Sequence, residues 1–321
     1  MILERVISPF LHKLQVRHVV ELDGSEATKI LQGCYVLPYT GGVYLDKDTF
    51  YGHSAFLPTK VKRITALGKF LFLKHLKCAT VIEHGPWKNY YHWLVDCIPR
   101  LWGLINSDIE IKGEVVLLIS RRMNKAEMLL VKSLLPENVV IRRVNRFVLF
   151  RVETFVFLPF LSRDRSGKLP FEYLTYFRKR VYSAFGITPA RQQLKIFISR
   201  RSSPKRRFSN QSDVEGFLVE QGFLCLQLEK LPINRQIEYF ANANIVVGSH
   251  GAGLTNIMFA PVSCRVIEIF HSAEFQHLCH YRDLAQALGL SYSSIVLDAA
   301  GKDDWAYLSL ERIRAALDDS G

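Results

Sequence analysis

The sequence predicts an α/β protein made of two domains of similar size. Short apolar runs typical of strands alternate along the chain with amphipathic segments of helical period. This alternation predicts parallel strands joined by helical crossovers. A length of 321 residues also suits two domains better than one. The polar stretch 187–193 separates two repeats of the pattern, so we place the domains at 1–186 and 187–300. We expect a terminal helix within 301–321 to pack back across both domains.

The first domain combines half-buried strands with longer helical segments. Its expected strands are 16–22, 35–37, 42–45, 70–74, 79–83, 115–120, 139–143 and 153–158. Its expected helices are 87–105, 125–135 and 170–185. Pro99 lies inside the first helix, and because proline breaks the backbone ladder we expect a kink there. Gly186 ends the third helix.

The second domain repeats the pattern more regularly. Its expected strands are 194–199, 223–228, 245–248, 266–270 and 291–297. Its expected helices are 211–221, 233–242, 275–288 and 304–317. This regularity predicts a Rossmann-like domain that holds a nucleotide.

Composition narrows the class of protein. The chain carries 42 Lys and Arg against 30 Asp and Glu, a formal net charge of +12 that makes polyanions attractive partners. No apolar run is long enough for a membrane span, and the N-terminus lacks the layout of a signal peptide. The six cysteines are scattered without zinc spacing, which favours free thiols in the cytoplasm.

The stretch 245–270 is the strongest functional motif. An apolar strand ends in Gly248-Ser-His-Gly-Ala-Gly253, a short helix follows, and the next strand carries Glu268. Glycines let the backbone approach a ligand, and the helix N-terminus favours a phosphate. His250 and Asn256 at the turn suit a pyrophosphate, and Glu268 stands where a carboxylate accepts hydrogen bonds from ribose hydroxyls. The alternative is a turn that only connects two elements.

A second motif lies between residues 84 and 102, where aromatic side chains alternate with polar ones. On a helix, Asn89, His92, Asp96 and Arg100 share one face. His92 and Asp96 are four residues apart, so they are expected to share a hydrogen bond of the kind that orients an imidazole base. The aromatic neighbours suit a sugar ring. The alternative is a helix whose aromatic residues are core and whose polar face is solvated.

A third motif is the basic loop after the strand at 194–199. The segment from Arg191 to Arg207 holds seven basic residues and no acid. Arginine's planar guanidinium suits phosphate oxygens, which favours Arg200 and Arg206 as ligands. Asn210 is placed to cap the following helix. A solvated basic surface loop is the alternative.

Together these three blocks resemble glycosyltransferase family 61, which includes eukaryotic O-linked GlcNAc and xylosyl transferases and bacterial capsular polysaccharide enzymes. The matching segments are Asn-Tyr-Tyr-His-Trp-Leu-Val-Asp-Cys-Ile-Pro-Arg-Leu, Ile-Ser-Arg with Arg-Phe-Ser-Asn, and His-Gly-Ala-Gly-Leu-Thr-Asn with a later Ile-Glu. They stand in the family's order from about Asn89 to Glu268. Gln211 departs from the pattern, because the family often has Glu there.

The resemblance implies a GT-B fold, in which two Rossmann-like domains face a central cleft. It implies inverting transfer from a nucleotide sugar, expected to be a UDP-sugar, to a glycan or lipid-linked saccharide in surface polysaccharide synthesis, without a cofactor or an essential metal. The implied base is His92 or Asp96. The donor residues that the resemblance implies are Arg200, Arg206, Asn210, His250, Gly251, Ala252, Gly253, Leu254, Asn256 and Glu268. The acceptor-side residues are His84, Asn89, Tyr91, Trp93 and Arg100.

Two other functions compete with this interpretation. A basic nucleic-acid-binding or polyanion-binding protein would explain the net charge, but an acid beside the glycine turn repels a phosphate backbone. A catalytically inactive relative would keep the fold alone. The basic surface also predicts peripheral contact with the anionic inner face of the membrane, where a lipid-linked acceptor would lie.

Overall fold

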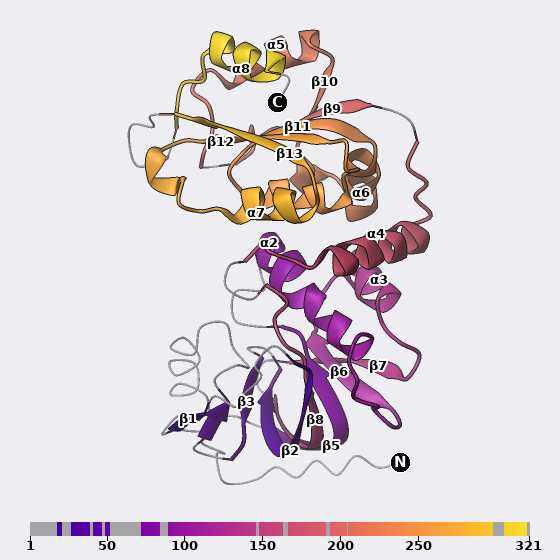
Figure 1. Ribbon diagram of the computed structural model, residues 1–321. Coiled ribbons are helices and arrows are strands. Elements are labelled where there is room, and N and C mark those ends of the chain that lie inside the picture. The colour runs from indigo at the N-terminus through magenta and orange to yellow at the C-terminus, as the bar shows by residue number, and fades with distance from the viewer. Residues whose placement is uncertain are drawn as a thin grey trace. The chain divides into compact units, whose positions relative to one another are not determined.

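The chain forms two compact units, Met1–Leu161 and Ser162–Gly321 (Figure 1). The computed structural model describes residues 18–20, 27–38, 41–46, 49–51, 72–83, 89–145, 148–162, 166–190, 193–203, 205–297 and 305–319. Both units combine a sheet with helices, so the predicted α/β class is confirmed.

The first unit is built on an eight-stranded mixed sheet of order β1-β4-β3-β2-β8-β5-β6-β7. The strands are β1 His18–Val20, β2 Lys29–Leu37, β3 Gly42–Tyr44, β4 Thr49–Tyr51, β5 Phe72–Val81, β6 Val115–Ser120, β7 Val139–Val144 and β8 Val148–Phe157. Strands β8, β5, β6 and β7 pair in parallel, whereas β2 pairs antiparallel with β3 and β8. The short connections between β2, β3 and β4 permit only antiparallel pairing. The Rossmann-like pattern predicted for this half therefore covers only part of its sheet.

The predicted helix over 87–105 forms in the first unit as three consecutive turns of different type. They are α2 Tyr90–His92, the π-helical η2 Trp93–Cys97 and the 3₁₀-helical η3 Ile98–Leu104. Pro99 has no N–H to continue the α-helical ladder, so the change of helix type at this point agrees with the predicted kink. Helix α3 Lys125–Ser133 begins with a capping box between Asn124 and Glu127.

The second unit is a doubly wound sheet in which all five strands are parallel, in the order β10-β9-β11-β12-β13. Helices α5 and α8 lie on one face of it, and α6 and α7 on the other (Figure 1). The strands are β9 Leu194–Ile198, β10 Phe223–Leu226, β11 Ala243–Ser249, β12 Arg265–Phe270 and β13 Ser291–Val296. The α-helices are α4 Phe171–Phe185, α5 Gln211–Glu220, α6 Ile233–Ala241, α7 His280–Ala287 and α8 Leu310–Asp318, and the 3₁₀ turns are η4 Leu228–Lys230, η5 Ala252–Phe259 and η6 Ala273–Phe275. The second half is Rossmann-like, as predicted.

Helix α4 belongs to the second unit, although the sequence placed it in the first domain. Its Arg178 Nε donates to the carbonyl of Met258 at 2.9 Å, and its Tyr182 hydroxyl donates to the carbonyl of Phe259 at 2.5 Å. Phe177 stacks on the ring of Phe259. These contacts outweigh the glycine at 186 as a boundary signal, because that glycine only ends the helix.

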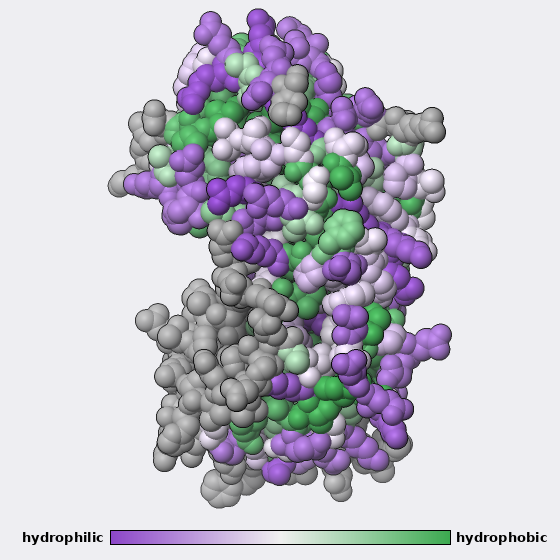
Figure 2. Space-filling model, viewed as in Figure 1, coloured by the Kyte–Doolittle hydropathy of each residue, from purple (hydrophilic) through white to green (hydrophobic). Residues whose placement is uncertain are grey.

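The terminal helix begins later than predicted. Ala306 forms a parallel bridge with Phe208, and α8 starts at Leu310. Ile313 is buried in the core of the second unit, while the charged residues of α8 point outward. Figure 2 shows the hydrophilic surface over α5 and α8. The helix therefore closes the second unit's sheet on that face.

Candidate active site

The topology of the second unit identifies the sheet edge where a ligand is expected. The chain runs from β9 to β10 on one side and then crosses to β11 on the other, so the winding reverses between β9 and β11. Doubly wound sheets bind ligands at the carboxyl ends of the strands beside such a reversal. Ser199 and Arg200 follow β9, and His250 and Gly251 follow β11. Two of the sequence motifs, far apart along the chain, thus meet at this edge.

Arg200 lies directly against the glycine turn. A β-carbon built on Gly251 would stand 2.6 Å from Arg200 Nη1, so only glycine leaves room for the guanidinium. Arg200 Nε donates to the carbonyl of Lys205, and Nη2 donates to Ser203 Oγ at 2.9 Å. The loop after β9 therefore holds the arginine in place.

Arg206 reaches the same turn from the other end of the loop. Its backbone is left-handed, with φ of 57°, and its Nη1 donates to the carbonyl of His250 at 2.8 Å. Its guanidinium lies over the ring of Phe275. Burial, and next the positive charge of Arg206, lower the pKa of Arg200. Two like charges at one turn are the kind of environment that favours a bound anion.

His250 and Glu268 form a buried pair beneath the turn. His250 Nδ1 lies 2.5 Å from Glu268 Oε1, and the Tyr292 hydroxyl donates to Glu268 Oε2 at 2.7 Å. Glu268 is fully buried. Both of its oxygens thus accept hydrogen bonds from this protein, whereas the sequence predicted that they serve a ribose. That ribose role stays a prediction.

The glycine turn leads into the 3₁₀-helix η5. The N–H of Leu254 bonds to the carbonyl of Gly251, and a helix leaves its first N–H groups, here those of Ala252 and Gly253, without intrahelical partners. Leu254 and Asn256 are fully buried, and the Asn256 amide donates to Gln236 Oε1 and to the carbonyl of Gly253. Their side chains therefore support the turn from within.

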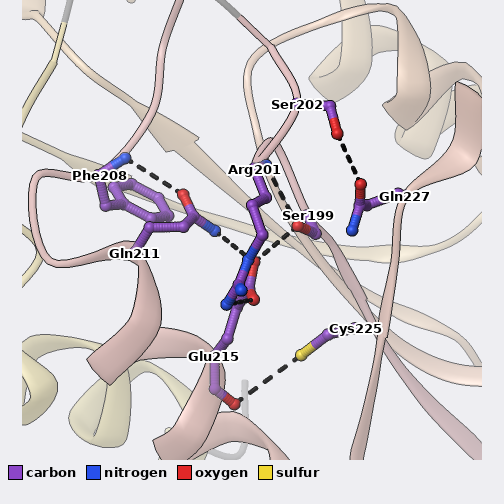
Figure 3. A network of polar contacts seen from close by, with 8 residues as sticks. All are labelled: Ser199, Arg201, Ser202, Phe208, Gln211, Glu215, Cys225 and Gln227. Carbon is purple, nitrogen blue, oxygen red and sulfur yellow. Dashed lines mark hydrogen bonds and ion pairs between the residues drawn. The ribbon is translucent and has the colours of Figure 1, made fainter.

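The loop that carries both arginines is anchored through Glu215 on α5 (Figure 3). Ser199 Oγ and Gln211 Nε2 donate to Glu215 Oε1 at 2.6 and 2.7 Å, and Arg201 Nη2 contacts Oε2 at 2.6 Å. Gln211 Oε1 in turn accepts from the N–H of Phe208. One carboxylate thereby holds the start and the end of the segment that contains Arg200 and Arg206.

Asn210 does not cap α5, contrary to the prediction. It occupies the N-cap position without a side-chain cap hydrogen bond. Its amide instead donates to the carbonyl of Leu308 and accepts from the N–H of the same residue. The pairing with the segment before α8 satisfies the amide, which therefore ties two parts of the second unit together.

In the first unit, the hydrogen bond predicted between His92 and Asp96 is present. His92 Nδ1 lies 2.6 Å from Asp96 Oδ2. The Asp96 side chain is fully buried, while 26% of the His92 side chain is exposed. Asn89 begins the helix, its Oδ1 accepting from the N–H of Tyr91 at 2.9 Å. The buried carboxylate orients an accessible imidazole.

The other acceptor-side candidates have different places. Arg100 is fully buried, its Nε donating to the carbonyl of Leu158 and its Nη1 to that of Ile82. It therefore joins the ends of β8 and β5 in the interior and is not on the same surface as His92. Tyr91 and Trp93 are also buried. His84 lies outside the described residues.

Sequence reasoning missed several residues at these sites. Tyr292 and Tyr281 lie on β13 and α7, with no motif around them. The ring of Tyr281 lies 5.3 Å from that of His250. Burial, and next the charge of Glu268, raise the pKa of this phenol. Glu215 could have been found from the sequence, because it follows Val214 on the buried face of a predicted helix, where an acid needs a partner.

Neither a metal cluster nor a membrane span stands out in the described part of the chain. Within these ranges no three His, Cys, Asp or Glu side chains gather as metal ligands would. None of the helices there has both the length and the apolar character needed to cross a membrane.

The fold and the site define an α/β protein in which two arginines lie beside a glycine turn at the reversal of a doubly wound sheet. The family model for Glycosyltransferase 61 matches residues 90–267, more than half of the chain. The protein belongs to the glycosyltransferase 61 family.

Curated relatives agree with this assignment. The chain is 29% identical over 107 residues to the EGF domain-specific O-linked N-acetylglucosamine transferase of Drosophila melanogaster, covering 32% of this chain and 20% of that protein. It is 28% identical over 124 residues to the enzyme of the same name from Gallus gallus, covering 36% and 23%. The match thus spans about a fifth of the relatives' length.

Proposed function

We propose that the protein is an inverting glycosyltransferase that moves a sugar from a nucleotide-sugar donor, first of all a UDP-sugar, to a glycan or lipid-linked saccharide. The observation that carries the proposal is the convergence of Arg200, Arg206 and the His250–Gly251 turn at one end of the sheet. A diphosphate matches this arrangement, because arginine and backbone N–H groups supply the donors that its oxygens need.

The reaction needs two kinds of help. A base takes the proton of the acceptor hydroxyl as its oxygen attacks the anomeric carbon, and the bond from that carbon to the diphosphate breaks. Negative charge then grows on the departing diphosphate. Arg200 and Arg206 stabilise this negative charge, and we expect them to do so without an essential metal.

For the base we propose His92, with Asp96 as the residue that orients it. The imidazole is partly exposed, whereas the carboxylate is buried and already bonded to Nδ1. Because Nδ1 is engaged by Asp96, we assign the proton transfer to Nε2. A substrate can reach an exposed imidazole more readily than a buried carboxylate.

A panel of nucleotide sugars tests the donor site. A true donor raises the melting temperature by mass action, with or without a divalent metal, and Arg206→Ala abolishes the shift. Incubation with the acceptor should then release the nucleoside diphosphate. A protein that ignores every nucleotide sugar and instead binds single-stranded oligonucleotides tightly would contradict the proposal and favour the polyanion-binding alternative.

The setting is also a proposal. We place the enzyme in the cytoplasm, in surface polysaccharide synthesis, with peripheral contact to an anionic membrane. Its support is the net charge of +12 and the exposed Lys179 and Arg180 of α4. Cosedimentation with phosphatidylserine vesicles at low salt and release at high salt are expected. Absence of vesicle binding at low salt would contradict the proposed membrane contact.

A further inference from the structure

A chain of three buried or half-buried side chains crosses the sheet beneath the glycine turn. It runs from His250 after β11 to Glu268 on β12 and Tyr292 on β13, with contacts of 2.5 and 2.7 Å. Burial, and then the negative charge of Glu268, raise the pKa of Tyr292, so the phenol stays protonated and donates. Both carboxylate oxygens are thus engaged from opposite sides, and Glu268 is held in one orientation.

This orientation assigns the tautomer of His250. An ionised carboxylate only accepts hydrogen bonds, so Nδ1 of the imidazole must carry a proton. In the neutral ring Nε2 then has a lone pair and no proton. The hydrogen bond that the His250 ring makes to Glu268 is through Nδ1, so Nε2 is the ring nitrogen that remains for a ligand.

The oxygens of a nucleotide sugar's diphosphate are likewise acceptors. A neutral His250 of this tautomer would present a lone pair to them, which is repulsive. The imidazolium, in contrast, carries an N–H at Nε2 while Nδ1–H still donates to Glu268. A diphosphate at the turn therefore favours the doubly protonated ring.

We propose that binding of the nucleotide sugar is coupled to uptake of one proton from solvent by Nε2 of His250, which then donates to the diphosphate. Glu268 and Tyr292 are positioning residues that fix the ring and its tautomer. The N–H bond that forms at Nε2 is balanced by loss of that proton from water or the buffer acid, and no bond of the nucleotide sugar breaks in this step. The inference rests on the proposed donor site and adds to it a proton on His250 and positioning roles for Glu268 and Tyr292.

The neighbours of His250 define the controls. Phe270 stacks on the ring at 5.3 Å, and α7 contributes Tyr281 at 5.3 Å and His280 at 6.3 Å. Arg206 contacts the His250 carbonyl, and Arg200 lies at Gly251. Of these groups, His280 carries the second imidazole beside His250, so it is the matched control.

Proton uptake is measured by isothermal titration calorimetry in buffers of one pH and different ionisation enthalpies. The ligand is the best binder among UDP-N-acetylglucosamine, UDP-glucose, UDP-galactose and UDP-xylose, none of which has a phosphate group that titrates near neutrality. At a pH of about 8, where an ordinary imidazole is mostly neutral, the wild type should take up about one proton per ligand bound. His280→Gln should take up the same number.

Three variants separate the roles. His250→Gln should bind without proton uptake. Glu268→Gln should also lose the uptake yet still bind, because the new amide can donate to Nδ1 and leave the proton of the neutral ring on Nε2. Tyr292→Phe should keep the uptake with affinity reduced by roughly three- to tenfold, as for one lost hydrogen bond.

The outcomes are distinct. Wild-type binding without proton uptake, or equal uptake by His250→Gln, overturns this inference and leaves the proposed donor site standing. Loss of all binding in a folded Glu268→Gln, with uptake unaffected in Tyr292→Phe and His250→Gln, would instead restore Glu268 as the ribose ligand and overturn the inference. Failure of every nucleotide sugar to bind the wild type overturns the proposed function and this inference together.

Discussion

The guanidinium of Arg200 packs against Gly251 so closely that a β-carbon on this glycine would approach Nη1 to 2.6 Å. The φ of Gly251 is 165°, which is extended backbone that any residue can adopt. The glycine is therefore required by the approach of the arginine and not by its own conformation. This contact joins the basic loop after β9 to the glycine turn after β11, two motifs that lie about 50 residues apart in the sequence.

Gly251→Ala should lower donor affinity while leaving the fold intact. The clashing atom is the end of a flexible side chain, so Arg200 can swing away at small cost in stability. Losing its charge-assisted hydrogen bond, worth about 1.5–3 kcal/mol, should weaken nucleotide-sugar binding roughly tenfold or more. Titration calorimetry and a thermal melt measure the two quantities.

Gly216→Ala is the matched control. This glycine lies on the exposed side of α5, and a β-carbon there meets nothing within 4 Å. Alanine should therefore stabilise the helix by about 0.5–1 kcal/mol without changing affinity. Equal affinities for the wild type and Gly251→Ala would show that Arg200 does not contact the donor.

Glu215→Gln should loosen the loop that carries both arginines. The change removes the charge that pairs with Arg201 and disturbs the bonds to Ser199 and Gln211. We expect a loss of about 1–3 kcal/mol in the free energy of unfolding and weaker donor binding. Denaturant unfolding monitored beside nucleotide-sugar titration measures both.

The control for this change is Glu238→Gln. Glu238 pairs with Arg235 on the surface of α6, and about half of each side chain is exposed. Its substitution should cost about 0–1 kcal/mol and leave binding unchanged. If the two variants behave alike, the Glu215 network does not position the loop.

The sequence predicted the second unit better than the first. Parallel strands buried on both faces produce clear apolar runs, so β9 to β13 were all found. In the first unit β5 was divided into two strands, because exposed Lys74, His75 and Lys77 interrupt its apolar pattern. Periodicity is weakest where one side of a strand faces water and its register depends on distant partners.

The candidate site was predictable in its parts and not in its internal bonds. Spacing alone predicted the hydrogen bond of His92 with Asp96, because i and i+4 face each other on a helix. The partners of Glu268 required tertiary structure, since His250 and Tyr292 approach it from neighbouring strands. The same spacing predicted Arg100 on that polar face, but the helix changes type at 93–104 and Arg100 is buried in the core.

Removing the proposed base should slow transfer without weakening the donor. His92→Ala and Asp96→Asn should each lower kcat by roughly 10²- to 10⁴-fold, the usual contribution of a general base. Nucleotide-sugar affinity should stay within twofold of the wild type, roughly 0.4 kcal/mol. His75→Ala, an exposed histidine on β5, should match the wild type in both measurements. A larger loss in Asp96→Asn than in His92→Ala would assign the base to the carboxylate.

Glu83 should make the first unit less stable as the pH rises. Its side chain is fully buried, one oxygen accepts from the N–H of Ser120 at 2.9 Å, and burial raises its pKa from 4.5 to about 8. The folded state thus holds this proton where the unfolded chain has lost it, which stabilises the folded state at low pH. That stability is fully present below about pH 4.5 and is lost as the pH rises through about 8.

Glu83→Gln tests this dependence, because the amide is neutral at every pH and its oxygen can still accept from Ser120. Denaturant unfolding should show the wild type losing stability between about pH 5 and 8, and the variant losing less over the same range. The difference between the two proteins should therefore grow with pH in favour of the variant. Parallel pH profiles would mean that Glu83 is ionised in the folded protein, and a cation or donor near its second oxygen would then have to be sought.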